Sequence, residues 1–298
     1  MNYTVQQLRI FLKVVETNSI TRASEELFMT QPAVSIQLKN FQDQFDVPLT
    51  EIIGRQLYVT DFGYEVAAMA ERALDELNAI QFKTREYEGK LTGRLRLSSA
   101  STGKYVIPYF LSGFMANHPG IDLTLDVTNK TRVVESLLTN RVDFALVSVL
   151  PGSMNLEEEL LIENRLYLIG NTSSYQKEKP LIYRETGSAT RLEMERYFKS
   201  HEKNVRKKLE LTSHEAVKEA VLAGLGYSIL PLIGIKSELI NQELYILPSK
   251  GLPVKTFWRL VWLKEKKLSP VARAYLDFVR AEKERIIEAH FRWYKEFS

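Results

Sequence analysis

The side chains that most often carry out catalysis are scarce in this sequence of 298 residues. It has no cysteine, which excludes disulfides, thiolate chemistry and cysteine metal sites. Its histidines lie far apart, without the spacing of metal ligands: His118, His201, His214 and His290. The sequence shows no Ser/His/Asp order and no nucleotide-binding loop. We therefore expect no catalytic residue, no metal site and no cofactor, and the remaining polar motifs indicate binding.

A helix predicted from residue 31 to about Phe45 carries polar residues suited to reading DNA. Thr30 is a suitable N-cap, and Pro32 falls in the first turn, where its missing N–H costs nothing. The residues expected to point inward are Ala33, Val34, Leu38 and Phe41, and those expected to point outward are Gln31, Ser35, Ile36 and Lys39. A glutamine can read adenine edges, a serine can reach a base or a phosphate, and an isoleucine can meet a thymine methyl group. The lysine suits a phosphate.

Two further short helices must position this one. The first has an apolar stripe at helical spacing: Val5, Leu8, Phe11, Leu12 and Val15. The second, which Ser19 or Thr21 can cap, has these apolar residues on one face: Ile20, Ala23, Leu27 and Phe28. Three short helices with a tight turn before the third make a helix-turn-helix, in which the start of the third helix faces the major groove. A plain three-helix bundle fits the same periodicity.

A short hairpin is predicted after Pro48, from residue 50 to residue 60, with its turn at Gly54. Its tip offers Arg55, the kind of residue that a wing inserts into the minor groove. The charge of residues 1–60 does not argue for DNA binding, because five basic residues stand against six acidic ones, which gives 5 − 6 = −1. If this segment binds DNA, a few specifically positioned side chains must make the contacts.

A long helix is predicted from Phe62 to Tyr87. Its apolar residues alternate four and three apart, as in the seam of a coiled coil: Val66, Ala70, Ala73, Leu77 and Ile80. The seam either packs on its own domain or pairs with a second subunit, and the spacing leaves both open. Gly89 and Gly93 close the helix and mark a domain boundary.

Residues 94–298 alternate between strand-like and helix-like segments, which predicts an α/β architecture of mostly parallel sheets. Strands are expected at residues 94–98, 122–127, 142–149, 166–169, 181–183 and 227–230, and helices at 104–116, 131–139, 191–199 and 215–223. The apolar runs 160–165 and 260–264 look like two crossings between subdomains.

Three sets of loop residues in this region are suited to binding an anion. In open α/β sheets a ligand lies beyond the carboxyl ends of the strands and faces helix N-termini, whose N–H groups bind carboxylates and phosphates. The candidates in the first loop are Ser99, Ser101, Thr102 and Lys104; those at the next strand ends are Thr128 and Ser148; those in the other subdomain are Ser188 and Thr190. Each serine or threonine alone is more simply explained as a helix cap, but three such loops converging on one cleft favour a ligand site.

Several runs resemble the signature of the LysR family of bacterial transcription regulators. They are residues 11–23 (FLKVVETNSITRA), residues 30–39 (TQPAVSIQLK), and Arg55 with residues 59–63 (VTDFG). Residues 215–231 (EAVKEAVLAGLGYSILP) resemble the family's second-lobe signature, and residues 268–270 (LSP) open the last helix as is common there. The chain departs from the pattern at Ile36, where the family usually has a polar or basic residue, and at residues 60–63, where it often has Thr-Pro-Ala-Gly.

The resemblance implies a winged helix-turn-helix DNA-binding domain at residues 1–60, a linker helix at 61–89 that pairs two subunits, and an effector-binding domain at 90–298. That last domain would be α/β with two lobes, similar to periplasmic solute-binding proteins. Lobe I would comprise residues 90–163 and 265–298, and lobe II residues 164–264. The resemblance also adds Thr21 and Arg22 to the expected DNA contacts.

The family further implies a regulator, in most cases an activator, that binds double-stranded promoter DNA as a homodimer or homotetramer and acts with RNA polymerase. A small effector, such as a carboxylate or a phosphorylated metabolite, would bind between the lobes and control promoter binding and DNA bending. Residues 101–105 and 184–191 also look like the subgroup that regulates carbon-fixation operons, although that subgroup usually has proline at the position of Thr186 and glycine at that of Ala189. A sugar phosphate as effector follows from this resemblance alone.

The first residues do not form a signal peptide, and no run approaches the ~20 apolar residues of a membrane span, so we expect a cytoplasmic protein. Two other functions compete with a ligand-controlled regulator. One is an enzyme on the same two-lobed fold, which no catalytic motif supports. The other is a constitutive DNA-binding protein whose C-terminal half only oligomerises.

Overall fold

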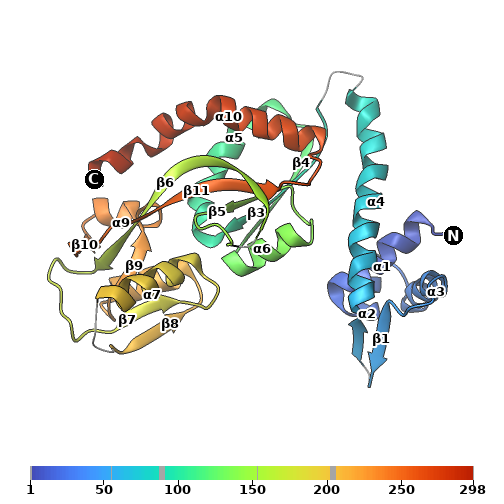
Figure 1. Ribbon diagram of the computed structural model, residues 1–298, viewed down its shortest axis with the longest axis horizontal. Helices are drawn as coiled ribbons and strands as arrows, with labels where there is room; N and C mark the ends of the chain where they lie inside the picture. Colours follow the sequence, from blue (N-terminus) through green and yellow to red (C-terminus); the bar gives the residue numbers. More distant parts are fainter. Residues whose placement is uncertain (1, 55, 87–90, 153, 202–205, 298) are drawn as a thin grey trace. The chain divides into compact units, whose positions relative to one another are not determined.

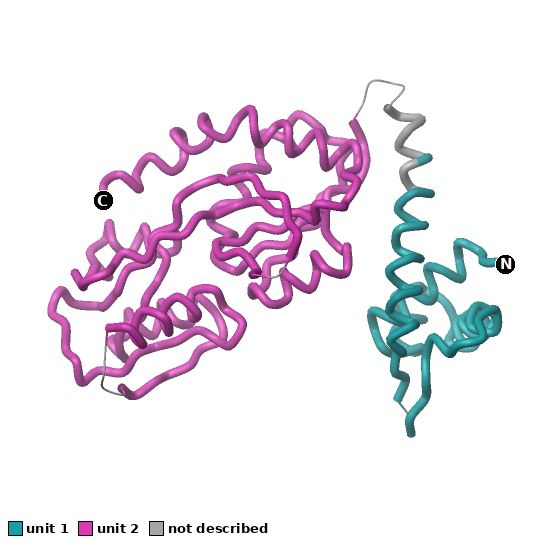
Figure 2. Tube along the Cα trace, in the orientation of Figure 1, with its two compact units in different colours: residues 1–90 teal, residues 91–298 magenta. Residues whose placement is uncertain are grey.

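The computed structural model describes residues 2–54, 56–86, 91–152, 154–201 and 206–297. The chain divides into two compact units, residues 1–90 and residues 91–298 (Figure 2). No helix among the described residues has the length and apolar character needed to cross a membrane.

Unit 1 is a helical domain with a small hairpin (Figure 1). Its elements are α1 (Val5–Thr17), α2 (Ile20–Glu26), α3 (Gln31–Gln42), β1 (Thr50–Ile53), β2 (Gln56–Val59) and α4 (Asp61–Glu86). Local signals set the helix starts, because Thr4 and Gln7 form a capping box on α1 and the Ser19 side chain accepts from the backbone N–H of Arg22 at the start of α2. Asn18 ends α1 in the left-handed region, at φ 48°.

The core of unit 1 lies between α1, α3 and the first half of α4. Its buried side chains are Ile10, Phe11, Val14, Val15, Ala23, Val34, Leu38, Phe41, Leu49 and Ala67. The inward positions predicted for Val34, Leu38 and Phe41 are confirmed, and Ala33 is half-buried.

Three details of the predicted helices are wrong. Val5, at the start of the predicted stripe of α1, is exposed, whereas Phe11 and Val15 are buried and Leu8 and Leu12 pack against the core. Helix α3 ends at Gln42 rather than near Phe45. Phe28 does not pack on the α2 face: the helix has already ended at Glu26, and Phe28 has a left-handed backbone, φ 53°, with 97% of its surface exposed.

Unit 2 contains a seven-stranded sheet in the order β10-β6-β11-β5-β3-β4, with β9 paired to β6, and a separate pair β7–β8. The strands are β3 (Gly93–Ala100), β4 (Ile121–Thr128), β5 (Phe144–Val147), β6 (Leu156–Gly170), β7 (Leu181–Arg184), β8 (Lys208–Leu211), β9 (Ser228–Pro231), β10 (Tyr245–Ile246) and β11 (Val254–Leu263). The helices are η1 (Ser101–Tyr105), α5 (Ile107–Asn117), α6 (Lys130–Leu138), α7 (Ala189–His201), α8 (His214–Leu222), η2 (Leu232–Gly234), α9 (Lys236–Ile240), α10 (Pro270–Phe291) and η3 (Arg292–Phe297). Helices α5 and α10 lie on one side of the large sheet and α6 on the other (Figure 1).

The expectation of mostly parallel sheets is wrong for the large sheet. Its parallel pairs are β3–β4 and β3–β5, whereas β6, β9, β10 and β11 pair antiparallel. The cause is the crossing between the lobes, because the chain enters lobe II along β6 and returns along β11 in the opposite direction.

The two predicted crossings are parts of β6 and β11, which are far longer than the expected apolar runs. Arg259, Leu260 and Val261 pair with β5, a lobe I strand. Lobe I and lobe II are the two parts of unit 2 that β6 and β11 connect.

The buried side of α1 gives a prediction about stability. Phe11 has no exposed surface and contacts the Phe41 ring, whereas Phe28 projects into solvent. Phe11→Ala removes a large buried ring and should lower the free energy of unfolding by about 3–5 kcal/mol. Phe28→Ala is the matched control and should change it by less than about 0.5 kcal/mol. Urea unfolding of the full chain, followed by circular dichroism, measures both, and equal losses would contradict this core.

Candidate functional site

The outward face of α3 presents the polar residues predicted for it. Gln31, Ile36 and Lys39 are exposed and Ser35 is half-buried. Thr30 is exposed and lies at the N-cap position, but its hydroxyl makes no capping hydrogen bond. Pro32, which has no N–H, lies in the first turn. Because Thr30 provides no cap, the other N–H groups at the start of α3 have no partner within the helix or from its N-cap.

The cations near this face differ in how they are paired. Lys13 lies 2.6 Å from Glu16 and 2.9 Å from Glu26, and these carboxylates raise its pKa. Arg22 and Lys39 are exposed and make no ion pair with any residue that the structure describes. Thr21, beside Arg22 at the start of α2, is also exposed. Arg22 and Lys39 are therefore available to phosphates.

The predicted hairpin is present as β1 and β2, with Gly54 at φ 67° in its turn. A positive φ of this kind favours glycine, which explains the residue at the tip. Arg55, the predicted wing contact, lies outside the described residues.

The seam predicted on α4 divides into two parts. Ala70 is buried and Val66 half-buried against the domain's own core. Ala73, Leu77 and Ile80 are exposed, the last by 65%. Packing on its own domain therefore explains only the first part of the seam. Tyr64 and Met69, which the sequence pattern did not single out, add exposed apolar surface to the same helix.

In unit 2, the carboxyl ends of the lobe I strands gather the predicted ligand residues at one edge of the sheet. Ala100 of β3 pairs with Thr128 of β4, and Ser99 pairs with Leu146, two residues before Ser148. Ser99, Thr102 and Ser148 are buried and Thr128 is half-buried. The Ser99 hydroxyl donates to the carbonyl oxygen of Ala100 at 3.1 Å.

The helix predicted at residues 104–116 is wrong at its start. A 3₁₀ turn, η1, covers Ser101–Tyr105, and α5 begins only at Ile107. Lys104 consequently lies within η1 and forms an ion pair with Glu215 at the start of α8. The Tyr105 hydroxyl lies 3.1 Å from the same carboxylate. These contacts join η1 of lobe I to lobe II.

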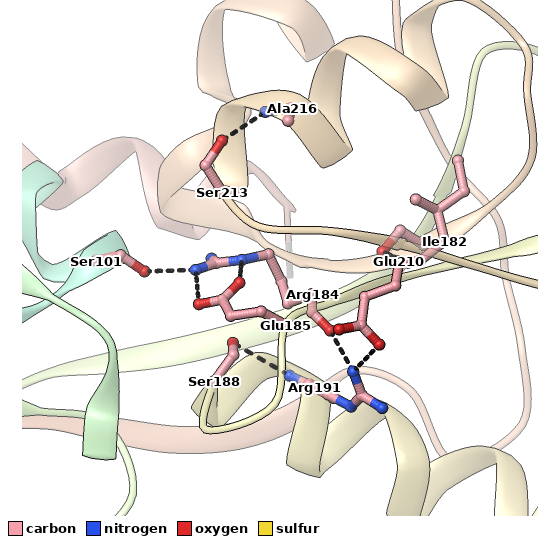
Figure 3. A network of polar contacts seen from close by, with 10 residues as sticks. Ser101, Ile182, Arg184, Glu185, Ser188, Arg191, Glu210, Ser213 and Ala216 are labelled. Carbon is pink, nitrogen blue, oxygen red and sulfur yellow. Dashed lines mark hydrogen bonds and ion pairs between the residues drawn. The ribbon is translucent and has the colours of Figure 1, made fainter. Parts of the chain in front are cut away.

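The second contact of η1 with lobe II involves a residue that sequence reasoning missed. The Ser101 hydroxyl accepts a hydrogen bond from Nη2 of Arg184, at the end of β7, at 3.0 Å (Figure 3). The sequence did carry a signal, because Arg184 is the first residue of the run 184–191 quoted above, although it was not among the predicted ligand contacts.

The β7–α7 loop provides the lobe II side of this region. Ser188 and Thr190 are buried, and the Ser188 hydroxyl accepts from the backbone N–H of Arg191 at 3.5 Å, which is the action of a helix cap (Figure 3). Gly187 has φ 90°, and a Cβ there would lie 2.6 Å from the Thr131 hydroxyl of lobe I. The two lobes are therefore in close contact at this loop as well.

A pocket of about 400 Å³ lies beside that contact, between the starts of α6 and α7. Its lining comprises Lys130, Thr131, Val134, Thr186, Gly187, Ser188, Arg191, Leu192 and Glu195. Of the predicted ligand residues only Ser188 belongs to it. The structure thus places the predicted residues in two neighbouring groups, one at η1 and Arg184 and one at the β7–α7 loop.

Electrostatics at the η1 contact follow from burial and pairing. Burial raises the pKa of Glu215, but hydrogen bonds from Lys104 and from its own backbone N–H outweigh it and lower that pKa to about 2. Burial lowers the pKa of the neighbouring His214 to about 4, so this ring is neutral at pH 7. Within the described part of the chain, no three carboxylates or histidines gather as metal ligands.

Both units match models of known families. Residues 5–64 match the model described as "Bacterial regulatory helix-turn-helix protein, lysR family", and residues 88–284 match the model described as "LysR substrate binding domain". Among curated proteins, the chain is 35% identical to the HTH-type transcriptional activator CmpR of Synechocystis sp., over 96% of this chain and 97% of that protein. It is 36% identical to the RuBisCO operon transcriptional regulator of Allochromatium vinosum, over 96% and 98%.

Solved structures show the same relationship. The CcmR regulatory domain of Synechocystis PCC6803, solved in complex with 2-PG, has 34% identity and a TM-score of 0.59, covering 64% of this chain and 98% of that one. Full-length CbnR, solved with its target DNA, has 19% identity and a TM-score of 0.65, covering 94% and 99%. The second likeness concerns the fold alone.

The Lys104–Glu215 pair predicts how stability depends on pH. Because the folded-state pKa of Glu215 lies near 2, below its ordinary value of 4.5, the pair stabilises the fold above pH 4.5 and this contribution is lost as the pH falls from 4.5 towards 2. The melting temperature of Glu215→Gln should therefore fall less than that of the wild type between about pH 5 and about pH 3. Glu243→Gln, which changes an exposed glutamate, is the control and should follow the wild type. An equally steep fall in Glu215→Gln would contradict the assignment.

Proposed function

Because this chain belongs to the LysR family of bacterial transcription regulators, we propose that it binds promoter DNA through α3 and that an anion between its lobes controls this binding. Its relatives are regulators rather than enzymes, and the chain is a DNA-binding transcription regulator with an effector-binding domain. The observation that carries the proposed mode of binding is the outward face of α3. It combines a glutamine, a serine and an unpaired lysine in the domain that matches the helix-turn-helix model.

On DNA, some of these residues would contact base edges and others the phosphate backbone. Gln31 and Ser35 contact base edges in the major groove, and Ile36 meets a thymine methyl group. Arg22 and Lys39 bind phosphates, helped by Thr21, Thr30, Pro32 and the free N–H groups at the start of α3. Arg55 of the wing enters the minor groove. The domain boundaries that go with this proposal are residues 1–60 for DNA binding, 61–89 for the linker helix and 90–298 for the effector.

The exposed part of the α4 seam supports a homodimer. Ala73, Leu77 and Ile80 lie on the seam beyond the region that the domain's own core covers, and they would pack against the same residues of a second copy. Two such copies present two recognition helices to half-sites about one DNA turn apart. We extend this to a homotetramer, the assembly that the family resemblance implies.

We propose that the effector is a small carboxylate or phosphorylated metabolite that binds between the lobes. The similar CcmR domain was solved with 2-PG, 2-phosphoglycolate, which is a small anion. In this chain the supporting features are Lys104, the neighbouring Arg184 and the start of α7. The proposed contacts are Ser99, Ser101, Thr102, Lys104, Thr128, Ser148, Ser188 and Thr190.

The names of two relatives support a role in carbon fixation: CmpR is a transcriptional activator, and the Allochromatium vinosum protein is a RuBisCO operon regulator. We propose activation, with RNA polymerase as partner, at promoters of carbon-fixation genes in the cytoplasm. The effector would act by changing how the assembly bends its DNA.

Gln31→Ala should weaken binding to the promoter of the regulated operon by about 1–3 kcal/mol and leave binding to random DNA unchanged, since a base contact carries the sequence information. Lys39→Ala should weaken binding to promoter and random DNA about equally. It should also reduce the slope of log K against log salt concentration by about 1. Gln6→Ala, an exposed glutamine on α1, is the matched control and should bind as the wild type does. Fluorescence anisotropy at several salt concentrations measures all three, and an equal loss of Gln31→Ala on both DNAs would refute the role of α3.

A further inference from the structure

Arg184 is a buried cation whose contacts are only partly satisfied. Its side chain is 3% exposed. Nε lies 2.7 Å and Nη2 2.8 Å from the two carboxylate oxygens of Glu185, and Nη2 also donates to Ser101 (Figure 3). Nη1 is buried without a hydrogen-bond partner in the described residues. A buried donor without a partner is costly, so this arrangement indicates that a further acceptor belongs at Nη1.

The unpaired edge of the guanidinium faces the contact between the lobes. Glu185 holds the edge formed by Nε and Nη2, which leaves the edge formed by Nη1 and Nη2. Ser101 of lobe I already touches that edge through Nη2. A planar guanidinium edge fits two oxygens of a carboxylate or phosphate, so an anion bound there would also lie beside η1.

The charges around this edge are nearly balanced. The Arg184 guanidinium is offset by Glu185, and Lys104 is offset by Glu215. His214, whose pKa is lowered by burial and also by Arg184 and Lys104, is neutral at pH 7. A singly charged ligand therefore gains little net attraction from the site as it stands. A doubly charged phosphate gains more attraction, and removal of one resident carboxylate would strengthen the binding of either ligand.

Glu185 is placed so that it can release the guanidinium. Its side chain is 16% exposed, in contrast to that of Arg184. Its backbone is fixed by the turn that follows, where the N–H of Ser188 donates to the Glu185 carbonyl at 3.2 Å and Gly187 has φ 90°. Rotation of the side chain alone frees Nε and Nη2 without moving the loop.

We propose that Arg184 is the anion anchor of the cleft and that Glu185 is an internal carboxylate that competes with the ligand for it. The inference rests on the proposed function, because it concerns the anionic effector of the same cleft. Glu185 lowers the affinity of the site for anions, and the site therefore selects a phosphate dianion over a monocarboxylate. Ligand binding transfers hydrogen bonds of Arg184 from Glu185 to the ligand, at the contact between Ser101 and Arg184 that joins the two lobes.

The test is calorimetric titration of the full-length protein with two probes, 2-phosphoglycolate and glycolate, which differ by the phosphate group. The wild type should bind the first and show no measurable binding of the second. Glu185→Gln keeps the size and removes the charge, so it should bind 2-phosphoglycolate at least tenfold more tightly, with a steeper salt dependence, and acquire measurable affinity for glycolate. If the Arg184–Glu185 ion pair were only structural, its loss would loosen the loop, and Glu185→Gln would bind 2-phosphoglycolate more weakly than the wild type.

Glu210→Gln is the matched control, because it removes a carboxylate that pairs with Arg191 at 2.6 Å on the same lobe and does not touch the Arg184 side chain. It should bind both probes as the wild type does. Thermal melting checks that each variant is folded. If Glu185→Gln fails to fold, Glu185→Asp keeps the charge but shortens the reach, and it should tighten 2-phosphoglycolate binding about threefold.

The outcomes separate this inference from the proposed function. Unchanged or weaker binding in the folded Glu185 variant, with a wild type that binds 2-phosphoglycolate, overturns the role of Glu185 and leaves the anionic effector in place. Binding by Glu185→Gln alone supports the competition. If neither the wild type nor any Glu185 variant binds 2-phosphoglycolate, the anionic effector fails and the inference fails with it.

Discussion

The antiparallel pairing of β6 with β11 is the constraint on which the rest of unit 2 depends. The two strands carry the chain into lobe II and back, and backbone hydrogen bonds join them along their length. Trp258, fully buried where the register shifts by a bulge, anchors the crossing in the hydrophobic core. Since the two lobes share this sheet, they can change position only by bending it. The polar contacts between η1 and lobe II are the part of the lobe contact that a ligand can exchange.

Among those contacts, the buried guanidinium of Arg184 is the group for which desolvation makes a missing partner costly. Arg184 and Lys104 each have a carboxylate partner, and in each case the contact reaches across the lobes, through Ser101 or directly to Glu215. A buried charge is tolerated only when it is paired, so an anion that engages Arg184 alters both its pairing and the fit of η1 against lobe II. The ligand can shift the lobes only by the difference in its affinity for their two arrangements. The charge of the ligand is thus coupled to the position of the lobes through one guanidinium.

The sequence predicted those features that depend on periodicity and short motifs. The inward set of α3, the hairpin at Gly54 and the cap Ser19 follow from spacing and local hydrogen bonding, and they were foreseeable. Features that depend on tertiary contacts were not foreseeable from the sequence. The burial of Ile10 and Val14 on α1, the 3₁₀ turn at Ser101 and the direction of β11 depend on packing against segments distant in sequence. The contact of Arg184 with Ser101 was missed for the same reason, because the two residues lie 83 positions apart.

The most direct measurement of the central claim is the distance between the lobes as the anion binds. The chain has no cysteine, so Asp122→Cys on lobe I and Lys199→Cys on lobe II, both exposed, give the sole sites for spin labels. Pulsed electron resonance on labelled protein diluted into unlabelled wild type then reports the distance within one chain. The account predicts that 2-phosphoglycolate shifts this distance, and that Glu185→Gln shifts it at lower ligand concentration. An unchanged distance at a concentration where calorimetry shows saturation would contradict the account.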